Sequence, residues 1–196
     1  MLSPPSSSGS FNIPPVVRGA LLALFATFSI WIHYQVKFGP HAQSMASRLQ
    51  LGNVKVRQPA PDFTATDLEE QQLNLKLLSA QHIVVLDFWA TWCPPCRHEL
   101  PALQALHDEY QAQGVEILMV NLQEPRPQIR EFMQRRQYKM RVIPDEDGAI
   151  ARLYGVRAIP TTVVVDKHGI VRWIGSGISY QTEEFKSLMT ELLNGS

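Results

Sequence analysis

The sequence predicts an α/β sandwich with a mixed central β-sheet, preceded by an N-terminal hydrophobic helix. Short apolar runs bounded by polar residues, typical of buried strands, alternate along the chain with segments whose apolar residues recur every three or four positions. Near the C-terminus, two apolar runs flank a short polar turn, which indicates an antiparallel hairpin. Strands separated by helices favour parallel pairing, and the hairpin adds antiparallel strands, so we expect a mixed sheet.

The elements of the folded part can be placed by residue number. Each strand is a run of apolar residues, and each helix has one apolar face. In chain order we expect a strand at 83–89, a helix at 95–114, a strand at 115–121, a helix at 127–138, a short helix at 149–154, hairpin strands at 161–166 and 170–174, and a helix at 183–193.

Four segments are expected along the chain. Residues 1–15 are rich in Ser, Pro and Gly and should be disordered. Residues 16–36 form a membrane anchor or signal segment, and residues 37–58 form a polar spacer. Residues 59–196 should then form one domain, since a single core commonly takes about 100–200 residues.

The apolar stretch at 19–32 contains no charged residue. This length suits the core of a signal peptide, and extension to Val36 approaches a membrane span. Trp31 and Tyr34 resemble an interfacial aromatic belt and favour a retained anchor. Small residues at 42–46 would suit cleavage, so removal of the segment stays an alternative.

The charge of the chain is balanced overall but unevenly distributed. Five of the 18 basic residues and none of the 18 acidic residues precede Asp62, so the remainder carries a formal charge of about −5. No cluster of Lys and Arg suggests a nucleic-acid groove, and we expect no nucleic-acid partner.

The two cysteines of the chain, Cys93 and Cys96, are separated by two prolines and follow a predicted strand. Two thiols are too few for a disulfide framework or for a four-ligand zinc site. Cys93 should lie where a helix beginning near Pro95 exposes unpaired N–H groups, which stabilise a thiolate. We therefore expect Cys93 to attack and Cys96 to resolve, and the redox-active disulfide between them to need no cofactor or metal.

Two acidic residues flank this pair. Asp87 lies inside an apolar strand, where burial would raise the pKa of its carboxyl group and suit it to exchange a proton with Cys96. The alternative is that Asp87 points outward from a strand edge. Glu99 lies three residues after Cys96 on the same helix face, where it either tunes the thiols or is an ordinary first-turn Glu. His98 is expected to be solvated.

Residues 85–96, VLDFWATWCPPC, resemble the active-site strand and loop of thioredoxins. The details are similar to the TlpA/ResA-like membrane-anchored thiol-disulfide oxidoreductases of bacteria. This resemblance covers roughly residues 59–193, from the APDF motif at 60–63, which is similar to that family's opening strand, and includes the Ile-Pro-Thr at 159–161. It implies a thioredoxin-like three-layer sandwich.

The resemblance also implies roles for individual residues. Cys93 would be the exposed nucleophile, and Pro160 a cis proline that faces the cysteines, with backbone next to it pairing with an extended segment of the substrate protein. The remaining side chains expected to contact substrate are Trp92, Pro95 and Ile159. Asp87 matches the buried acid of thioredoxins and Glu99 the acid of ResA-like members, so either one can be the proton carrier.

The implied function is extracytoplasmic reduction of disulfides in substrate proteins, for example apocytochrome c. It requires a membrane thiol electron donor and an anchor that makes the chain a single-pass protein of the inner or cytoplasmic membrane, with the domain on its periplasmic side. Basic residues on both sides of the apolar stretch leave this topology open, and the resemblance favours it.

Three other functions stay open. The same pair could work in the opposite direction as a disulfide oxidase. The domain could be a copper-binding thioredoxin-fold chaperone that uses the two sulfurs and His98. It could also be a tethered binding module without catalysis. A peroxidase is disfavoured because the chain has no separate peroxidatic cysteine.

Overall fold

The computed structural model describes residues 50–51, 54–176 and 182–195 of the chain. The chain divides into two units, residues 1–45 and 46–196, and all the described residues belong to the second. The expected disordered N-terminus, the apolar segment at 16–36 and the first part of the expected spacer lie outside the described residues. Within the described ranges, no helix is long and apolar enough to cross a membrane.

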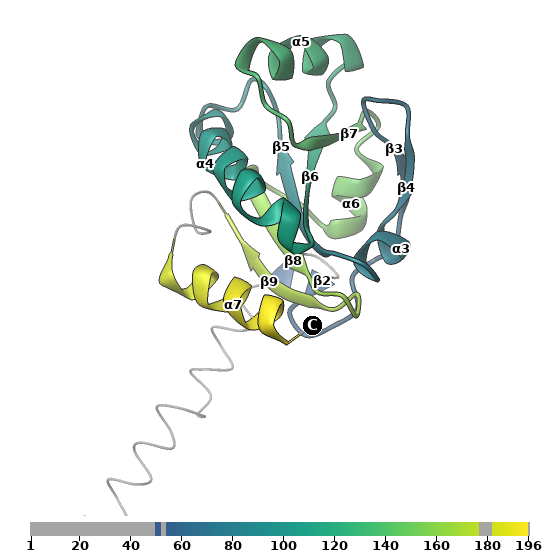
Figure 1. The fold of residues 1–196 in the computed structure, drawn as a ribbon. Coiled ribbons are helices and arrows are strands. Elements are labelled where there is room, and N and C mark those ends of the chain that lie inside the picture. The colour runs from purple at the N-terminus through teal and green to yellow at the C-terminus, as the bar shows by residue number, and fades with distance from the viewer. Residues whose placement is uncertain (1–49, 52–53, 177–181, 196) are drawn as a thin grey trace, which may run out of the picture. The chain divides into compact units, whose positions relative to one another are not determined.

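A five-stranded mixed sheet forms the centre of the domain, in the order β7-β6-β5-β8-β9 (Figure 1). The strands β5, β6 and β7 are parallel, whereas β8 is antiparallel to both β5 and β9, which confirms the predicted mixed sheet. The bounds are β5 (Ile83–Trp89), β6 (Val115–Leu122), β7 (Arg141–Asp145), β8 (Thr161–Val165) and β9 (Val171–Gly175).

Helices cover both faces of this sheet. The first face is covered by α4 (Pro94–Tyr110), α5 (Arg126–Arg136) and α7 (Glu183–Asn194), whose buried residues form one hydrophobic cluster with alternate residues of β5. The second face is covered by α3 (Leu75–Ser79), α6 (Ala149–Tyr154) and the hairpin of β3 (Thr64–Thr66) and β4 (Gln72–Asn74). These layers confirm the thioredoxin-like three-layer sandwich.

The central strand β5 is buried along its whole length. Because side chains alternate across a strand, Val85 and Trp89 join the cluster under α4, while Leu86 and Phe88 join the cluster on the opposite face. Asp87 has the same parity as Val85 and Trp89. The fold therefore directs this carboxyl group toward the layer that contains α4.

The boundaries of α4 follow from its end residues. Proline lacks a backbone N–H, and the N–H groups of the first turn have no partner within a helix, so Pro94 and Pro95 fit there without loss. At the other end, a 3-10 turn at Gln111–Gln113 leads to Gly114, whose φ of 85° is in the left-handed region that glycine adopts without strain.

The hairpin of β3 and β4, the helix α3 and the strand β7 were not predicted from the sequence. The hairpin of β3 and β4 has only three residues in each strand, too few to show a period. The strand β7 contains Pro144, which disfavours a strand prediction. The structure places β7 at the edge of the sheet, where a missing N–H removes no necessary hydrogen bond.

The predicted spacer at 37–58 extends too far. Val54 of β2 (Val54–Lys55), which pairs with β1 (Gln50–Leu51), is 1% exposed and belongs to the second hydrophobic cluster. The N–H of Arg57 donates to the carbonyl of Val171 at 2.7 Å, so this segment packs against β9. The motif at 60–63 is also not a strand, since β3 begins only at Thr64.

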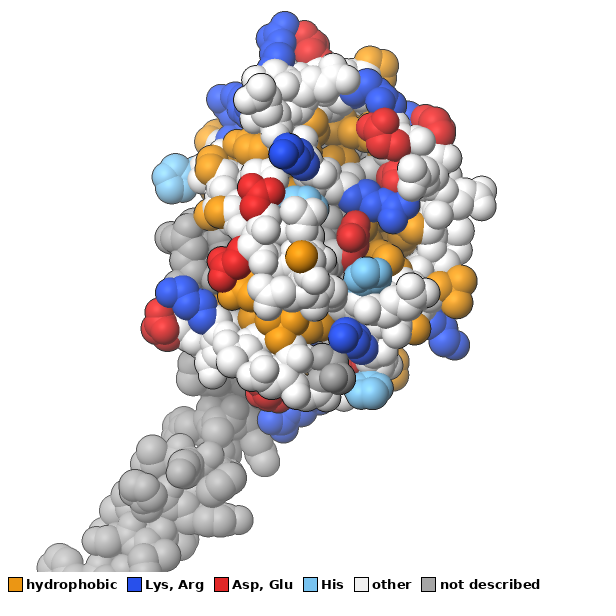
Figure 2. All heavy atoms as spheres, in the orientation of Figure 1, with side chains coloured by type: hydrophobic (Ala, Val, Ile, Leu, Met, Phe, Trp, Pro, Cys, Tyr) orange, Lys and Arg blue, Asp and Glu red, His pale blue; other side chains and the backbone are white. Residues whose placement is uncertain are grey.

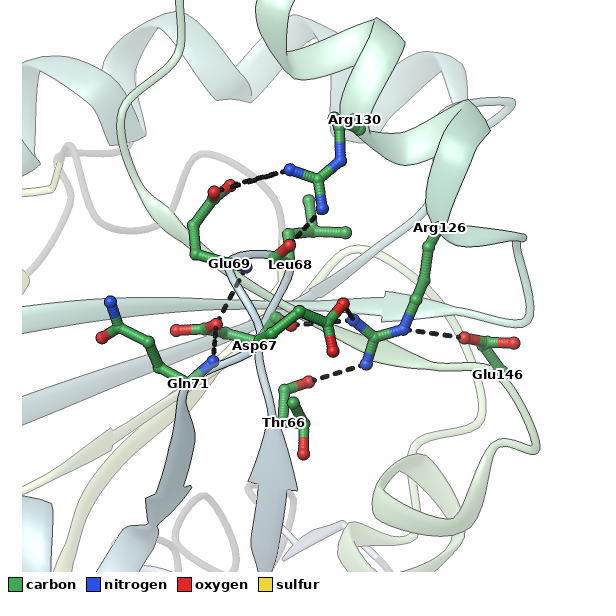
Figure 3. Close-up of polar contacts among 9 residues, drawn as sticks. Thr66, Asp67, Leu68, Glu69, Gln71, Arg126, Arg130 and Glu146 are labelled. Carbon is green, nitrogen blue, oxygen red and sulfur yellow. Dashed lines mark hydrogen bonds and ion pairs between the residues drawn. The ribbon is translucent and has the colours of Figure 1, made fainter.

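Two arginines of α5 fix that helix to the turn between β3 and β4 (Figure 3). Arg126 donates to the carbonyls of Thr66 at 3.1 Å and Asp67 at 2.8 Å, and Arg130 donates to the carbonyl of Leu68. The buried carboxylate of Asp67 accepts two backbone N–H groups of the same turn. Hydrogen bonds from charged groups to backbone are among the stronger ones, so α5 has a defined position on the domain.

On the face of the molecule shown in Figure 2, basic and acidic side chains are interspersed. Neither sign of charge is gathered into a single patch there. This distribution is typical of an ordinary solvated surface.

The packing of α4 on the sheet gives a test of the fold. Leu103 of α4 is fully buried, so Leu103→Ala should lower the free energy of unfolding by about 2–5 kcal/mol through lost burial and a residual cavity. Leu77 of α3 is 70% exposed, and Leu77→Ala should change it by less than about 0.5 kcal/mol. Urea unfolding measures both, and equal effects would contradict this account of the core.

Candidate active site

The two cysteines form a disulfide at the start of α4, with a Cα–Cα distance of 5.3 Å. The loop that leaves β5 carries Cys93 to the position immediately before the helix, and Cys96 lies in the first turn. Because a sulfur three positions along a helix lies one turn away, the two sulfurs meet without any distortion of the sheet.

Cys93 is the N-cap residue of α4. Its sulfur accepts a hydrogen bond from the backbone N–H of Cys96 at 3.2 Å. The first N–H groups of a helix have no partner within it and, together with the helix dipole, favour an anion at this end. Helix N-termini are among the positions at which proteins hold reactive cysteines, and the attack by Cys93 stays a prediction.

The structure corrects the expected exposure of Cys93. This residue is only 3% exposed and Cys96 is fully buried, so the predicted order holds but the nucleophile is less accessible than expected. The sulfur of Cys93 lies 3.9 Å from the carbonyl oxygen of Ile159, and both cysteines pack in the hydrophobic cluster under α4. The disulfide is therefore covered by protein in this oxidised form.

The peptide bond between Ile159 and Pro160 is cis, as the resemblance implies. The contact of Ile159 with Cys93 places this bond beside the disulfide, although the two segments are 66 residues apart. Pro160 is buried, Ile159 is half-buried, and Trp92 and Pro95 are exposed, with Trp92 at 64%. Their contact with a substrate stays a prediction.

Asp87 lies in the middle of the central strand and is fully buried, so the alternative of an outward side chain at a strand edge is wrong. The Thr162 hydroxyl on the neighbouring strand donates to its Oδ1 at 2.9 Å, and Oδ2 has no hydrogen-bond partner among the described residues. Burial raises the pKa of Asp87 to about 7, an effect that the hydrogen bond from Thr162 partly opposes.

Glu99 lies one turn beyond Cys96 on α4 and is 1% exposed. It is therefore not an ordinary solvated residue of the first turn. Burial, and secondly the negative charge of Asp87, raise the pKa of Glu99 to about 8. Because the negative charge on one carboxylate disfavours ionisation of the other, the two protons leave in two steps, and the two pKa values belong to the pair.

A group of polar residues around Glu124 was not predicted from the sequence. Thr91, in the loop before Cys93, donates through its backbone and its hydroxyl to the buried carboxylate of Glu124, which Asn121 and Gln128 also contact. One signal was available. Glu124 follows a predicted parallel strand, and the carboxyl ends of neighbouring parallel strands meet at one edge of a sheet.

The metal alternative finds no support in the geometry. The described part of the chain has no group of three or more His, Cys, Asp or Glu side chains that could hold a metal ion, and His98 is exposed. The expectation that the chain uses no metal or cofactor stays a prediction.

Comparison with known proteins identifies the family. A model of the AhpC/TSA family matches residues 56–174. A thiol-disulfide oxidoreductase ResA from Halalkalibacterium halodurans is 37% identical over 132 residues, which cover 66% of this chain and 74% of that protein. The chain belongs to the ResA-like thiol-disulfide oxidoreductases of the AhpC/TSA family. A ResA from Geobacillus thermodenitrificans is 40% identical over 124 residues, which cover 63% of this chain and 71% of that protein.

A solved structure agrees with this assignment. A Chlorobium tepidum protein described as a thiol:disulfide interchange protein DsbE is 28% identical, with a TM-score of 0.65, and the match covers 72% of this chain and 99% of that protein. This ResA-like chain is therefore a thioredoxin-fold thiol-disulfide oxidoreductase, and Cys93 and Cys96 are its two cysteines.

The buried acid of this ResA-like enzyme predicts an unusual pH dependence. The pKa of Asp87 is about 7 in the folded chain against an ordinary 3.8, so the folded state binds the proton more tightly. The contribution of Asp87 to stability should therefore be fully present below about pH 4 and be lost as the pH rises through about 7. Asp87→Asn removes this ionisation and should stabilise the oxidised protein by roughly 2–4 kcal/mol at pH 8, with little gain at pH 4.

Urea unfolding at the two pH values measures this difference. Thr162→Val serves as a control, since it removes the hydrogen-bond donor to Asp87 but keeps the ionisable group. A gain for Asp87→Asn that is the same at both pH values would show that the carboxyl group is not the cause.

Proposed function

We propose that this chain is a membrane-tethered, extracytoplasmic reductase of disulfides in substrate proteins. The observation that carries the proposal is the disulfide at the start of α4, in which the sulfur of Cys93 accepts the N–H of Cys96 beside the Ile159–Pro160 bond. A sulfur so placed is a thiolate in the reduced enzyme and a good leaving group in the oxidised enzyme.

The first step is nucleophilic. The thiolate of Cys93 attacks one sulfur of the substrate disulfide, a Cys93–substrate disulfide forms, and the other substrate sulfur leaves as a thiolate that takes up a proton. Trp92 precedes Cys93 in the chain and is exposed, and the carbonyl of Ile159 lies 3.9 Å from the sulfur of Cys93, so both would bind the substrate segment. An extended segment pairs with free backbone groups in this way in other complexes.

The second step releases the product. Cys96 loses its proton and attacks the sulfur of Cys93, the Cys93–Cys96 disulfide forms, and the second substrate sulfur leaves as a thiol. Two electrons pass from the enzyme to the substrate. A carboxyl group with a pKa near neutrality can accept a proton at physiological pH, and Asp87 and Glu99 both meet this condition. Glu99 lies one turn beyond Cys96 on α4, and Asp87 faces the layer that contains α4.

The enzyme must then be reduced again, and a membrane thiol donor would supply the two electrons. The apolar stretch at 19–32 supports a tether to the membrane, and a tether raises the effective concentration of the enzyme at such a donor. The ResA and DsbE names of the similar proteins support disulfide-containing proteins as substrates, and apocytochrome c is the substrate that we propose to test.

Substitution of the resolving cysteine tests the reaction. Cys96→Ala should stop the second step and accumulate a disulfide between Cys93 and the substrate, visible on a non-reducing gel and lost on reduction. Cys93→Ala is the matched control and should accumulate none. Mass spectrometry of the trapped species identifies the substrate. The redox state of the wild-type enzyme in growing cells gives the direction, since Cys93 and Cys96 of a reductase should be mainly in the dithiol form. A mainly oxidised wild type would indicate an oxidase, and no trapped species would contradict both directions.

The location is tested separately. A reporter enzyme that is active only outside the cytoplasm, fused after Ser196, should be active in the full chain. Removal of residues 1–36 from the same fusion should abolish this activity. An inactive reporter on the full chain, with an intact fusion, would place the domain in the cytoplasm.

A further inference from the structure

The active-site turn, defined here as residues 90–93, rests on a buried carboxylate that the mechanism above does not use. The N–H of Cys93 donates to the carbonyl of Ala90 at 3.2 Å and closes the turn. Thr91 lies inside it. The carboxylate is that of Glu124, which is 4% exposed and comes from the loop between β6 and α5.

Four donors converge on this carboxylate. The N–H of Thr91 donates to Oε2 at 2.6 Å, and its hydroxyl donates to Oε1. The side-chain amide of Asn121 donates to Oε2 at 2.8 Å, and that of Gln128 donates to Oε1 at 2.5 Å. Gln128 also donates to the hydroxyl of Thr91 at 3.0 Å, so this hydroxyl accepts one hydrogen bond and donates another to Glu124.

The fold brings these residues together from three elements. Trp89, at the end of β5, is paired with Asn121 of β6, and Thr91 and Glu124 each lie two residues beyond the end of their strand. Gln128 belongs to α5, which the arginine contacts in Figure 3 fix to the β3–β4 turn. The group therefore joins the active-site turn to rigid parts of the domain.

The backbone before Glu124 is held in an uncommon conformation. Gln123 has a φ of 54°, in the left-handed region that residues other than glycine rarely adopt, and its N–H donates to the carbonyl of Asp145 at 3.1 Å. Such conformations persist where the surrounding contacts require them, and they cluster at functional sites. Here the left-handed residue reverses the chain so that Glu124 faces the active-site turn.

We propose that Glu124 is a positioning residue, which acts through Thr91 to fix the active-site turn and thereby holds the sulfur of Cys93 against the N–H of Cys96. A carboxylate has only acceptors, so it matches four donors, whereas a Gln in its place would direct an N–H₂ group at some of them. A turn that is free to shift would lose the alignment that stabilises the thiolate. The proposal deepens the function proposed above, because it concerns the same pair of cysteines.

The test uses the full chain with Glu124→Gln, with Thr91→Val and with both changes. The rate at which each reduced protein reduces a peptide with an internal disulfide should fall about tenfold for Glu124→Gln and several-fold for Thr91→Val. Because Glu124 acts through Thr91, the double variant should be no slower than Glu124→Gln alone. Effects that multiply in the double variant would overturn the proposal.

A second readout separates positioning from stability. In the Cys96→Ala background, the pH at which Cys93 is half-reactive toward iodoacetamide should rise in Thr91→Val, which keeps the side chain of Glu124 and loses only the two hydrogen bonds of the Thr91 hydroxyl. Asp166→Asn is the matched control. Asp166 is a buried carboxylate that accepts the N–H groups of His168 and Ile170 at the far end of β8 from Pro160, and its change should lower stability and leave the reactivity of Cys93 unchanged.

The outcomes are distinguishable. If Asp166→Asn slows exchange as much as Glu124→Gln does, the effect is one of general stability and the proposal fails. If Glu124→Gln does not fold, Thr91→Val tests the proposal alone. A Thr91→Val variant with an unchanged rate of peptide reduction and an unchanged pH midpoint of Cys93 alkylation would overturn it. If the wild-type chain does not reduce the peptide, the proposed function fails instead.

Discussion

The hydrogen bond from the N–H of Cys96 to the sulfur of Cys93 is the interaction on which the rest of the site depends. It exists because Cys93 is the last residue before α4, where backbone N–H groups lack partners within the helix. A sulfur elsewhere on the same helix would meet no such donors and would have an ordinary pKa. The burial of β5, the prolines at the start of α4 and the packing of α4 on the sheet all serve to hold that helix end in place.

The same helix end explains why the interior contains acids. A thiol-disulfide exchange moves protons as well as electrons, and Cys96 is fully buried, where water cannot take its proton directly. Asp87 and Glu99 lie in the interior, and burial brings their pKa values near neutrality. Each of these two carboxyl groups lowers the stability of the fold when it is charged, because a buried carboxylate is unfavourable unless hydrogen bonds or opposite charges offset its lost hydration. The domain tolerates this cost within a large core, whose two hydrophobic clusters cover both faces of the sheet.

The disulfide has two sides with different properties. On the outer side, Trp92 is exposed and the backbone of Ile159 reaches the sulfur of Cys93, so this side is suited to a changing partner. On the other side, the buried carboxylate of Glu124 accepts four hydrogen bonds and is tied through Asn121 to β6 and through Gln128 to α5. Side chains whose positions are fixed by such contacts hold a site in one geometry.

The central strand, the helix that follows it, the reactive pair and the family could all be predicted from local patterns, because these features depend on neighbours along the chain. The apolar run at 83–89, the prolines after Cys93 and the three-residue spacing of the cysteines are all local patterns. Four features became known only from the three-dimensional arrangement: Asp87 faces α4, the carbonyl of Ile159 contacts Cys93, β7 is an edge strand, and Glu124 accepts hydrogen bonds from Thr91. Those facts depend on strand order and on contacts between segments 33 to 66 residues apart, which no pattern of adjacent residues contains.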